Sequence, residues 1–344
     1  MAVKKRTFRN RLGLILGLGA ALAVLLVPPL LGRYPTYLAT TILMLAVFSV
    51  GFNLLFGYTG LLSFGHAAFY ALGAYVCAKV LLGYPSLILG LLAGVAAAGV
   101  GALVIGFLSV RHTRIYFSML TLAFGMMVHS IVWKWREVTG GDDGLVGIIR
   151  PNLNLGFVEV NMNRPENFYY FVAVILLASI FIMYRVVNSP FGLVLQAIRD
   201  SESRAAFCGI PVRRYRLAAF VVSGLYAGLA GSFVAPLERA VTPVYAHWTF
   251  SAEPVLATLL GGINSFLGPI VGALLFRLLK EVIVRYTEYW QLALGIIVVI
   301  IVLGFRGGVV SVVESWIRPW LGPGEPRFVQ KVASESSGQE APAR

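Results

Sequence analysis

The sequence predicts an all-α fold, a polytopic transmembrane helix bundle of about 9–10 segments with a half-helix or re-entrant segment near 253–263. Hydrophobic residues make up 58% of the 344 residues and charged residues only 12%, which is too little charge to cover a soluble domain of this length. The apolar residues are gathered into runs of about 20, the length that crosses a bilayer as a helix. The 37 glycines suit helices that approach one another closely in lipid.

The apolar runs define the segments in chain order. Leu12–Leu31 follows a basic tail, residues 1–11, and is too long for the core of a signal peptide, so we expect an uncleaved first span. The next spans are expected at Thr36–Phe56, Leu61–Leu82, Ser86–Val110, Ile115–Trp133, Phe168–Val187 and Leu217–Leu237. The run Glu253–Ile263 is short and ends in a pair of glycines, which predicts a half-helix. Phe266–Val284 and Trp290–Phe305 complete the bundle.

The basic residues predict the orientation of the bundle. The amino-terminal tail has five basic residues and no acids, and the block Asn188–Arg216 has five against two. The loop Lys134–Asn167 has four basic residues against five acids. Basic loops are retained on the cytoplasmic side, so the tail and the block are expected inside and the loop outside. This distribution also accounts for the net charge of +13 without a nucleic-acid partner. The polar residues after 306 predict a disordered cytoplasmic tail over 307–344.

Signatures of catalysis are missing from the sequence. There is no HExxH, GxSxG or Walker A motif, so we expect neither an enzymatic activity nor a cofactor bound by this chain. Cys77 lies in an apolar run and Cys208 in the polar block, which argues against a disulfide and against a metal site.

The block Asn188–Arg216 is a polar, helix-compatible insert between two apolar runs. Ser189 is a good helix cap and Pro190 suits the first helical position, while Gly209 followed by Pro211 suits the end. The apolar residues that can share one face are Val194, Leu195, Ile198 and Ala205.

Two questions about this block stay open from the residues alone. Asp200 is an alternative cap that would divide the block into two short helices. A basic amphipathic helix can lie on anionic lipid headgroups, and a short, capped, charged helix can equally be gripped by another protein.

Polar residues inside the spans are the other candidates for function. Asn53, Thr59, Ser63 and His66 cluster where one span turns into the next, and Ser118, Thr121 and His129 lie in the fifth span. They are neutral and would suit a zwitterion or an uncharged solute. For His66 we favour a structural histidine that is hydrogen-bonded to a neighbouring backbone carbonyl. A fixed intramembrane charge is hard to find, because Lys79 and Glu281 lie near span ends.

Two further patterns bear on packing and on the outer loop. Small residues four apart permit close approach of helices at Gly90/Gly94, Ala97/Gly101, Gly224/Gly228, Ala227/Gly231 and Gly268/Gly272. The stretch TGGDDGL from Thr139 predicts a tight turn, which would either be a simple surface turn, touch an outside partner or help to close the outer mouth.

Several long motifs resemble one known family. The block and the span after it read NSPFGLVLQAIRDSESRAAFCGIPVRRYRLAAFVVSGLYAGLAG, and the other matching motifs are GYTGLLSFGHAAFYALGAY, IYFSMLTLAFG, TGGDDGL and LGGINSFLGPIVGA. Over roughly Leu38 to Gly308 the sequence resembles the LivM-type permease subunits of ABC importers for branched-chain amino acids.

The resemblance implies a transmembrane permease domain over 12–306, with a coupling segment at 188–216 and an extracytoplasmic loop at 134–167. It implies a multi-pass protein of the bacterial inner membrane with a cytoplasmic amino terminus. The implied partners are a second permease subunit, two cytoplasmic ATP-binding subunits that hold ATP and Mg²⁺, and a periplasmic substrate-binding protein.

The resemblance also implies site residues. Those expected to contact an ATPase subunit are Gly192, Ala197, Ile198, Arg199, Asp200, Ala205 and Gly209. By polarity and placement, the substrate path would contain Asn53, Ser63, His66, Ser118 and Thr121.

Other functions remain compatible with the sequence. Related permeases import urea, amides or other small polar solutes. A stand-alone secondary carrier or channel would use the polar cluster near His66 without an ATPase. A membrane scaffold would use the basic block only to bind lipid.

Overall fold

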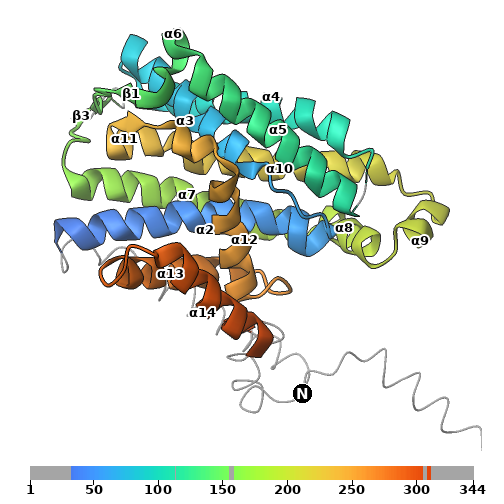
Figure 1. The fold of residues 1–344 in the computed structure, drawn as a ribbon. Coiled ribbons are helices and arrows are strands. Elements are labelled where there is room, and N and C mark those ends of the chain that lie inside the picture. The colour runs from blue at the N-terminus through green and yellow to red at the C-terminus, as the bar shows by residue number, and fades with distance from the viewer. Residues whose placement is uncertain (1–31, 113, 155–158, 305–307, 311–344) are drawn as a thin grey trace, which may run out of the picture.

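A computed structural model of the chain describes residues 32–112, 114–154, 159–304 and 308–310. Long helices lie side by side in a single bundle, and β-strands are confined to short pairs at one end (Figure 1). Six of the described helices are long and apolar enough to cross a membrane. The predicted all-α polytopic bundle is therefore confirmed. The tail 1–11, the span Leu12–Leu31 and, except for residues 308–310, the tail 307–344 lie outside the described residues.

The central spans follow the predicted runs closely. Their observed bounds are α2 Arg33–Thr59, α3 His66–Gly83, α4 Leu87–Ser109, α5 Arg114–Lys134, α7 Pro165–Val187 and α10 Val212–Ser232, which α11, Val234–Glu238, continues. One boundary is corrected. The helix expected from Leu61 begins only at His66, because Gly60 ends α2 in a left-handed conformation with φ of 75° and residues 60–65 form no helix.

The carboxyl-terminal third contains the expected short helix. α12, Trp248–Gly261, lies across the direction of the long helices in Figure 1. Its 14 residues extend about 21 Å, which is less than a bilayer core of about 30 Å. It begins earlier than the predicted Glu253, because the His247 side chain caps its first turn by accepting a hydrogen bond from the Thr249 amide. α13, Gly268–Val284, and α14, Trp290–Gly304, follow.

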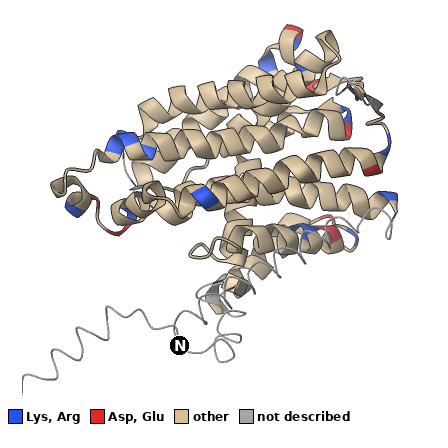
Figure 2. Cartoon of the chain, turned by 180° about the vertical axis from the view of Figure 1, so that it is seen from behind, with Lys and Arg blue, Asp and Glu red and all other residues tan. Residues whose placement is uncertain are grey.

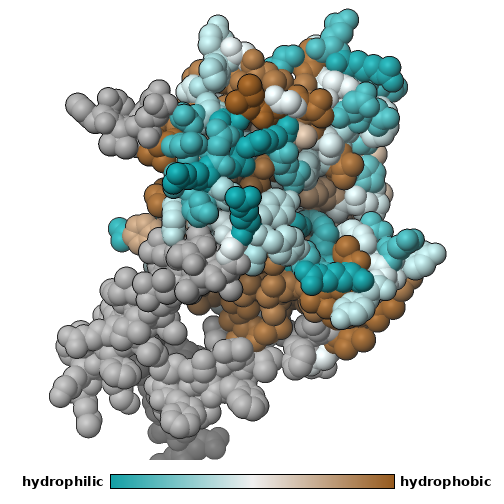
Figure 3. Space-filling model, turned by 90° about the vertical axis from the view of Figure 1, so that its left-hand side faces the viewer, coloured by the Kyte–Doolittle hydropathy of each residue, from teal (hydrophilic) through white to brown (hydrophobic). Residues whose placement is uncertain are grey.

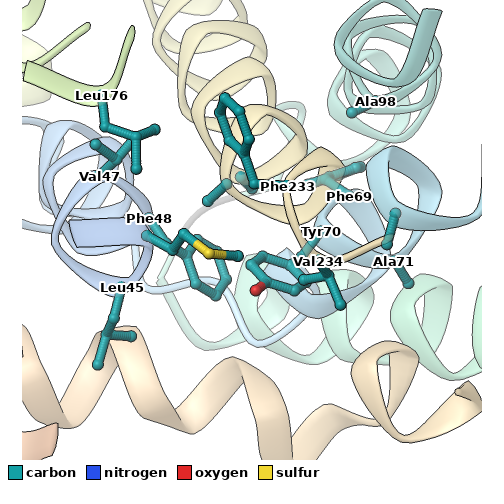
Figure 4. Packing of buried hydrophobic residues seen from close by; sticks show 14 of the residues in the cluster. Leu45, Val47, Phe48, Phe69, Tyr70, Ala71, Ala98, Leu176, Phe233 and Val234 are labelled. Atoms are coloured by element: carbon teal, nitrogen blue, oxygen red, sulfur yellow. The ribbon is translucent and has the colours of Figure 1, made fainter. Parts of the chain in front are cut away.

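Close backbone approach holds the middle of the bundle together. α10 packs between α2, α3 and α4, and glycines line these contacts. A Cβ atom on Gly231 would lie 2.0 Å from the carbonyl oxygen of Tyr70, and one on Gly73 would lie 2.3 Å from that of Gly228. Phe48, Tyr70 and Phe233 fill the space beside these contacts (Figure 4). The small-residue pairs of α10 therefore bring helices together as their spacing predicted.

The loop before α7 forms one end of the molecule. It contains α6, Arg136–Thr139, the 3₁₀ turn η1, Gly141–Asp143, and the strands β1, Leu145–Val146, β2, Leu153–Asn154, and β3, Glu159–Val160. β1 pairs antiparallel with β4, Ala240–Val241, and β2 pairs with β3. Figure 3 looks at this end and shows hydrophilic side chains gathered over it. The predicted tight turn is present, with positive φ at Gly140, Gly141 and Gly144.

Arg150 fixes this loop to the bundle. The buried guanidinium donates hydrogen bonds to the carbonyl oxygens of Pro236 at 2.7 Å, Met162 at 3.1 Å and Leu237 at 3.2 Å, and it lies 4.0 Å from the centre of the Phe168 ring. Burial, with a smaller contribution from nearby Arg239, lowers the pKa of Arg150 to about 10. The side chain is therefore still charged at neutral pH and can hold all three carbonyl groups.

Candidate functional site

The polar block forms two short helices at the end of the bundle opposite the β-strands (Figure 1). These are α8, Pro190–Asp200, and α9, Glu202–Phe207, and Figure 2 shows basic residues concentrated around them. We call this unit, residues 188–216, the α8–α9 segment. The block is indeed divided in two, but Ser201 rather than Asp200 caps the second helix, its hydroxyl accepting a hydrogen bond from the Arg204 amide.

A second detail of the capping differs from the prediction. Ser189 occupies the N-cap position of α8, but its hydroxyl donates a hydrogen bond back to the carbonyl oxygen of Val186 at 2.6 Å and caps nothing. Pro190 begins α8 as predicted, and Gly209, with φ of 80°, follows the end of α9. The fixed φ of Pro190 and the left-handed Gly209 therefore set the start of α8 and the turn after α9.

The α8–α9 segment has its own small core and a defined shape. Ile198, Ala205 and Val212 are buried together, at the junction of α8, α9 and α10. Arg216 of α10 donates two hydrogen bonds of 2.8 Å, one to each carboxylate oxygen of Glu202. This paired geometry fixes α9 against α10 more firmly than a single ion pair would.

The residues expected to contact an ATPase divide by exposure. Gly192, Ile198 and Ala205 are buried against this chain's own helices, so they shape the segment and present no side chain to a partner. Ala197, Asp200 and Gly209 are exposed and stay predicted contacts. Two exposed apolar side chains were missed, Phe207 with 91% of its surface exposed and Leu193 with 65%. An isolated phenylalanine in a charged stretch is the signal that could have identified Phe207.

Arg199 connects the segment to the interior of the bundle. Its guanidinium donates one hydrogen bond to the carbonyl oxygen of Gly57, near the end of α2, and another of 3.0 Å to the side chain of Asn264 between α12 and α13. Its aliphatic stem lies against Gly60. Displacement of α8 would therefore act directly on α2 and on the turn that follows the half-helix.

The five predicted path residues are brought together, but their hydrogen bonds stabilise the non-helical stretch, residues 60–65, that precedes α3. The His66 ring lies 2.9 Å from the Ser63 hydroxyl through Nδ1 and 2.7 Å from the Ser223 hydroxyl through Nε2. A structural histidine was expected, but its partners are hydroxyl groups and not a backbone carbonyl. Ser118 donates to the carbonyl oxygen of Leu62, and Thr121 accepts from the Phe64 amide. Asn53 is buried nearby, and none of the five lines the described cavity.

Replacing His66 with alanine is expected to destabilise the protein by about 3 kcal/mol. The change leaves a cavity and removes the partner of two buried hydroxyl groups. Thermal unfolding of the full chain in detergent measures the effect. Ser223→Ala is the matched control and should cost about 1 kcal/mol. Equal stability of His66→Ala and the wild type would contradict the structural role.

The described cavity lies elsewhere, in the half of the bundle away from the α8–α9 segment. Its volume is about 650 Å³, and the first half of α2 lines it together with α11, α12, α13 and the start of α14. Aromatic side chains form much of its wall, and it also contains four charged residues that the sequence analysis did not select, Glu238, Glu253, Arg277 and Lys280. The sequence analysis considered only Lys79 and Glu281, and it overlooked Arg277 and Lys280 within the predicted span Phe266–Val284. Arg277 and Lys280 are three residues apart on α13, whereas Glu238 and Glu253 belong to α11 and α12, so tertiary packing brings the two acids to the two bases.

Lys280 and Glu253 form an ion pair within this cavity. The Lys280 ammonium lies 2.6 Å from a Glu253 carboxylate oxygen and 4.5 Å from the centre of the Trp290 ring. Because this pair is largely shielded from solvent, it neutralises its own two charges and ties α12 to α13.

Comparisons with known proteins agree with this architecture. The chain is 29% identical to the high-affinity branched-chain amino acid transport system permease protein LivM of Escherichia coli, over 92% of this chain and 79% of that protein. It is 26% identical to the probable LivM permease of Methanocaldococcus jannaschii, over 73% of this chain and 81% of that protein, and 24% identical to LivH of E. coli, over 77% and 91%. No solved structure matches significantly. The family model described as branched-chain amino acid transport system / permease component matches residues 34–303, so the chain belongs to this family of membrane permeases.

Proposed function

We propose that this chain is one permease subunit of an ATP-driven importer of branched-chain amino acids, and that an ATPase subunit drives it through the α8–α9 segment. Similarity to permeases of branched-chain amino acid transport systems supports the substrate class. The observation that carries the mechanism is the double contact of Arg199, which joins an exposed, capped segment to Gly57 and Asn264 inside the bundle.

The segment has the properties that a docking element requires. Its own core and the Arg216–Glu202 pair keep its shape, while Phe207 and Leu193 present apolar surface outward. A partner that buries an exposed phenylalanine gains hydrophobic free energy and grips the segment at one point. Movement of the gripped segment then passes through Arg199 to the end of α2 and to the turn after α12.

The proposed assembly contains subunits beyond this chain. Similarity to both LivM and LivH supports a pair of related permeases. In this proposal two cytoplasmic subunits bind ATP and Mg²⁺, and a periplasmic protein delivers the amino acid. The chain lies in the inner membrane with its amino terminus in the cytoplasm, which places the α8–α9 segment on the side where ATP is available.

Reconstitution tests this function. The complete set of subunits in proteoliposomes, with ATP inside and the loaded binding protein outside, should accumulate radiolabelled leucine. Omitting this chain, or inactivating the ATPase subunits, should abolish accumulation. Leucine transport by this chain alone and without ATP would contradict the proposal and favour a stand-alone carrier.

A further inference from the structure

We propose that the cavity lined by α2, α11, α12 and α13 binds an aliphatic α-amino acid in its zwitterionic form, with Arg277 receiving the carboxylate and Glu238 the ammonium group. This inference rests on the proposed function and deepens it by assigning a substrate site within the membrane subunit.

The charges of the cavity leave one cation and one anion without a mutual partner. Lys280 and Glu253 neutralise each other at 2.6 Å. Arg277 makes no ion pair with any residue that the structure describes, and its Nε atom is buried without a hydrogen-bond partner there. A half-buried guanidinium without an ion-pair partner is available to an anionic ligand. A planar carboxylate is the group that its fork of donors fits.

Glu238 provides the complementary charge at the mouth of the cavity. Its carboxylate receives hydrogen bonds from the Tyr245 hydroxyl and, at 3.4 Å, from the Tyr37 hydroxyl. Burial and the adjacent Glu238 raise the pKa of Tyr245, so this hydroxyl stays protonated and continues to donate. Both tyrosines are neutral, so they orient the exposed Glu238 carboxylate without cancelling its charge.

The two charges line the same cavity. Arg277 and Glu238 both belong to its wall, yet they form no direct ion pair with each other. A ligand with a carboxylate and an ammonium group can occupy the space between them. An anion alone or a cation alone would leave one of the two protein charges uncompensated.

The remaining wall suits an aliphatic side chain. The Phe250 ring lies 4.8 Å from that of Tyr70 and 6.2 Å from that of Phe48, measured between ring centres. Phe48 and Tyr70 lie next to each other, with Leu45 close by (Figure 4). Burying a branched aliphatic group on these surfaces contributes about 2 kcal/mol. The volume of about 650 Å³ is within the range of small-molecule sites.

Ligand binding to the purified full-length chain tests the site directly. Saturation-transfer NMR, which detects weak binding, would compare leucine with 4-methylpentanoate, which lacks the ammonium group, and 3-methylbutylamine, which lacks the carboxylate. Wild type should bind leucine at least about tenfold more tightly than either analogue. Arg277→Ala should bind leucine and the amine equally, and Glu238→Gln should bind leucine and the carboxylate equally.

The pattern across ligands separates recognition from structural damage. A folding defect would weaken binding of all three compounds together, whereas loss of one recognition contact removes discrimination at one end of leucine. Arg285→Ala is the matched control, because Arg285 is exposed just beyond α13 and pairs with Glu281 at 3.4 Å. It should bind like the wild type. Absence of leucine binding by the wild type, unchanged binding by Arg277→Ala, or a uniform loss for all ligands would overturn the inference.

Failure of this site and failure of the proposed function give different results. A complex that accumulates leucine with an Arg277→Ala subunit as well as with the wild type contradicts only the site. A chain that binds leucine as described, in a complex that does not accumulate it, supports the site and contradicts the proposed importer.

Discussion

Replacing Arg199 with alanine is expected to reduce ATP-driven leucine uptake at least about tenfold while the chain still inserts and assembles. The change removes the two hydrogen bonds that join α8 to Gly57 and Asn264 but leaves the core of the α8–α9 segment intact. The ATPase subunits should still bind and hydrolyse ATP, because the exposed surface is unchanged. Uptake and ATP hydrolysis, measured in the same proteoliposomes, would show this uncoupling.

Asp200 supplies the matched control for this prediction. It is the neighbouring residue, it is exposed, and its side chain makes no hydrogen bond or ion pair within the described part of the chain. Asp200→Ala should therefore leave transmission inside the chain intact, and any loss of uptake should come with weaker ATPase binding. Uptake at the wild-type level by the double variant, with both residues replaced, would contradict the role of the segment in coupling.

Replacing Gly231 with alanine is expected to destabilise the bundle by about 3 kcal/mol or more. The added Cβ would lie 2.0 Å from the carbonyl oxygen of Tyr70, so α3 and α10 would have to move apart. Backbone atoms cannot rotate out of the way as a side chain can. Thermal unfolding in detergent, followed by fluorescence-detected gel filtration, measures the loss.

Gly295→Ala is the control for this packing prediction. It is the same substitution within a helix, α14, but a Cβ at Gly295 meets no atom within 4 Å. Because alanine favours the helix by up to about 1 kcal/mol over glycine, this variant should be at least as stable as the wild type. Equal melting temperatures for Gly231→Ala and the wild type would show that α3 and α10 are not in backbone contact.

The sequence predicts the spans well because a bilayer imposes a length and a composition on each of them. It fails at the start of α3, where residues 61–65 are apolar enough to continue a helix. Hydropathy does not report that Gly60 takes a left-handed conformation, or that Ser63, Ser118 and Thr121 satisfy the backbone of this break. The early start of α12 was missed for a similar reason, since the cap comes from His247.

The sequence predicted the position of the α8–α9 segment but not its tertiary contacts or the cavity. Caps and composition identified the α8–α9 segment, because these are local properties of consecutive residues. The hydrogen bond from Arg199 to Asn264 and the burial of Ile198 and Ala205 depend on segments distant in the sequence. Composition therefore says nothing about them. The cavity was missed altogether, because Glu238, Glu253 and Arg277 belong to three different segments and only the packing of α11, α12 and α13 brings them to one cavity.

Labelling of Cys208 tests most directly whether an ATPase subunit docks on the α8–α9 segment. The chain has two cysteines, of which Cys77 is buried and Cys208 is exposed next to Phe207. A membrane-impermeant maleimide should label Cys208 from the cytoplasmic side of vesicles that contain this chain alone. Assembly with the ATPase subunits should slow this labelling at least about tenfold, as expected for a residue covered by a stable interface. Cys208→Ser sets the background, and an unchanged labelling rate in the complete complex would contradict docking of an ATPase subunit on the α8–α9 segment.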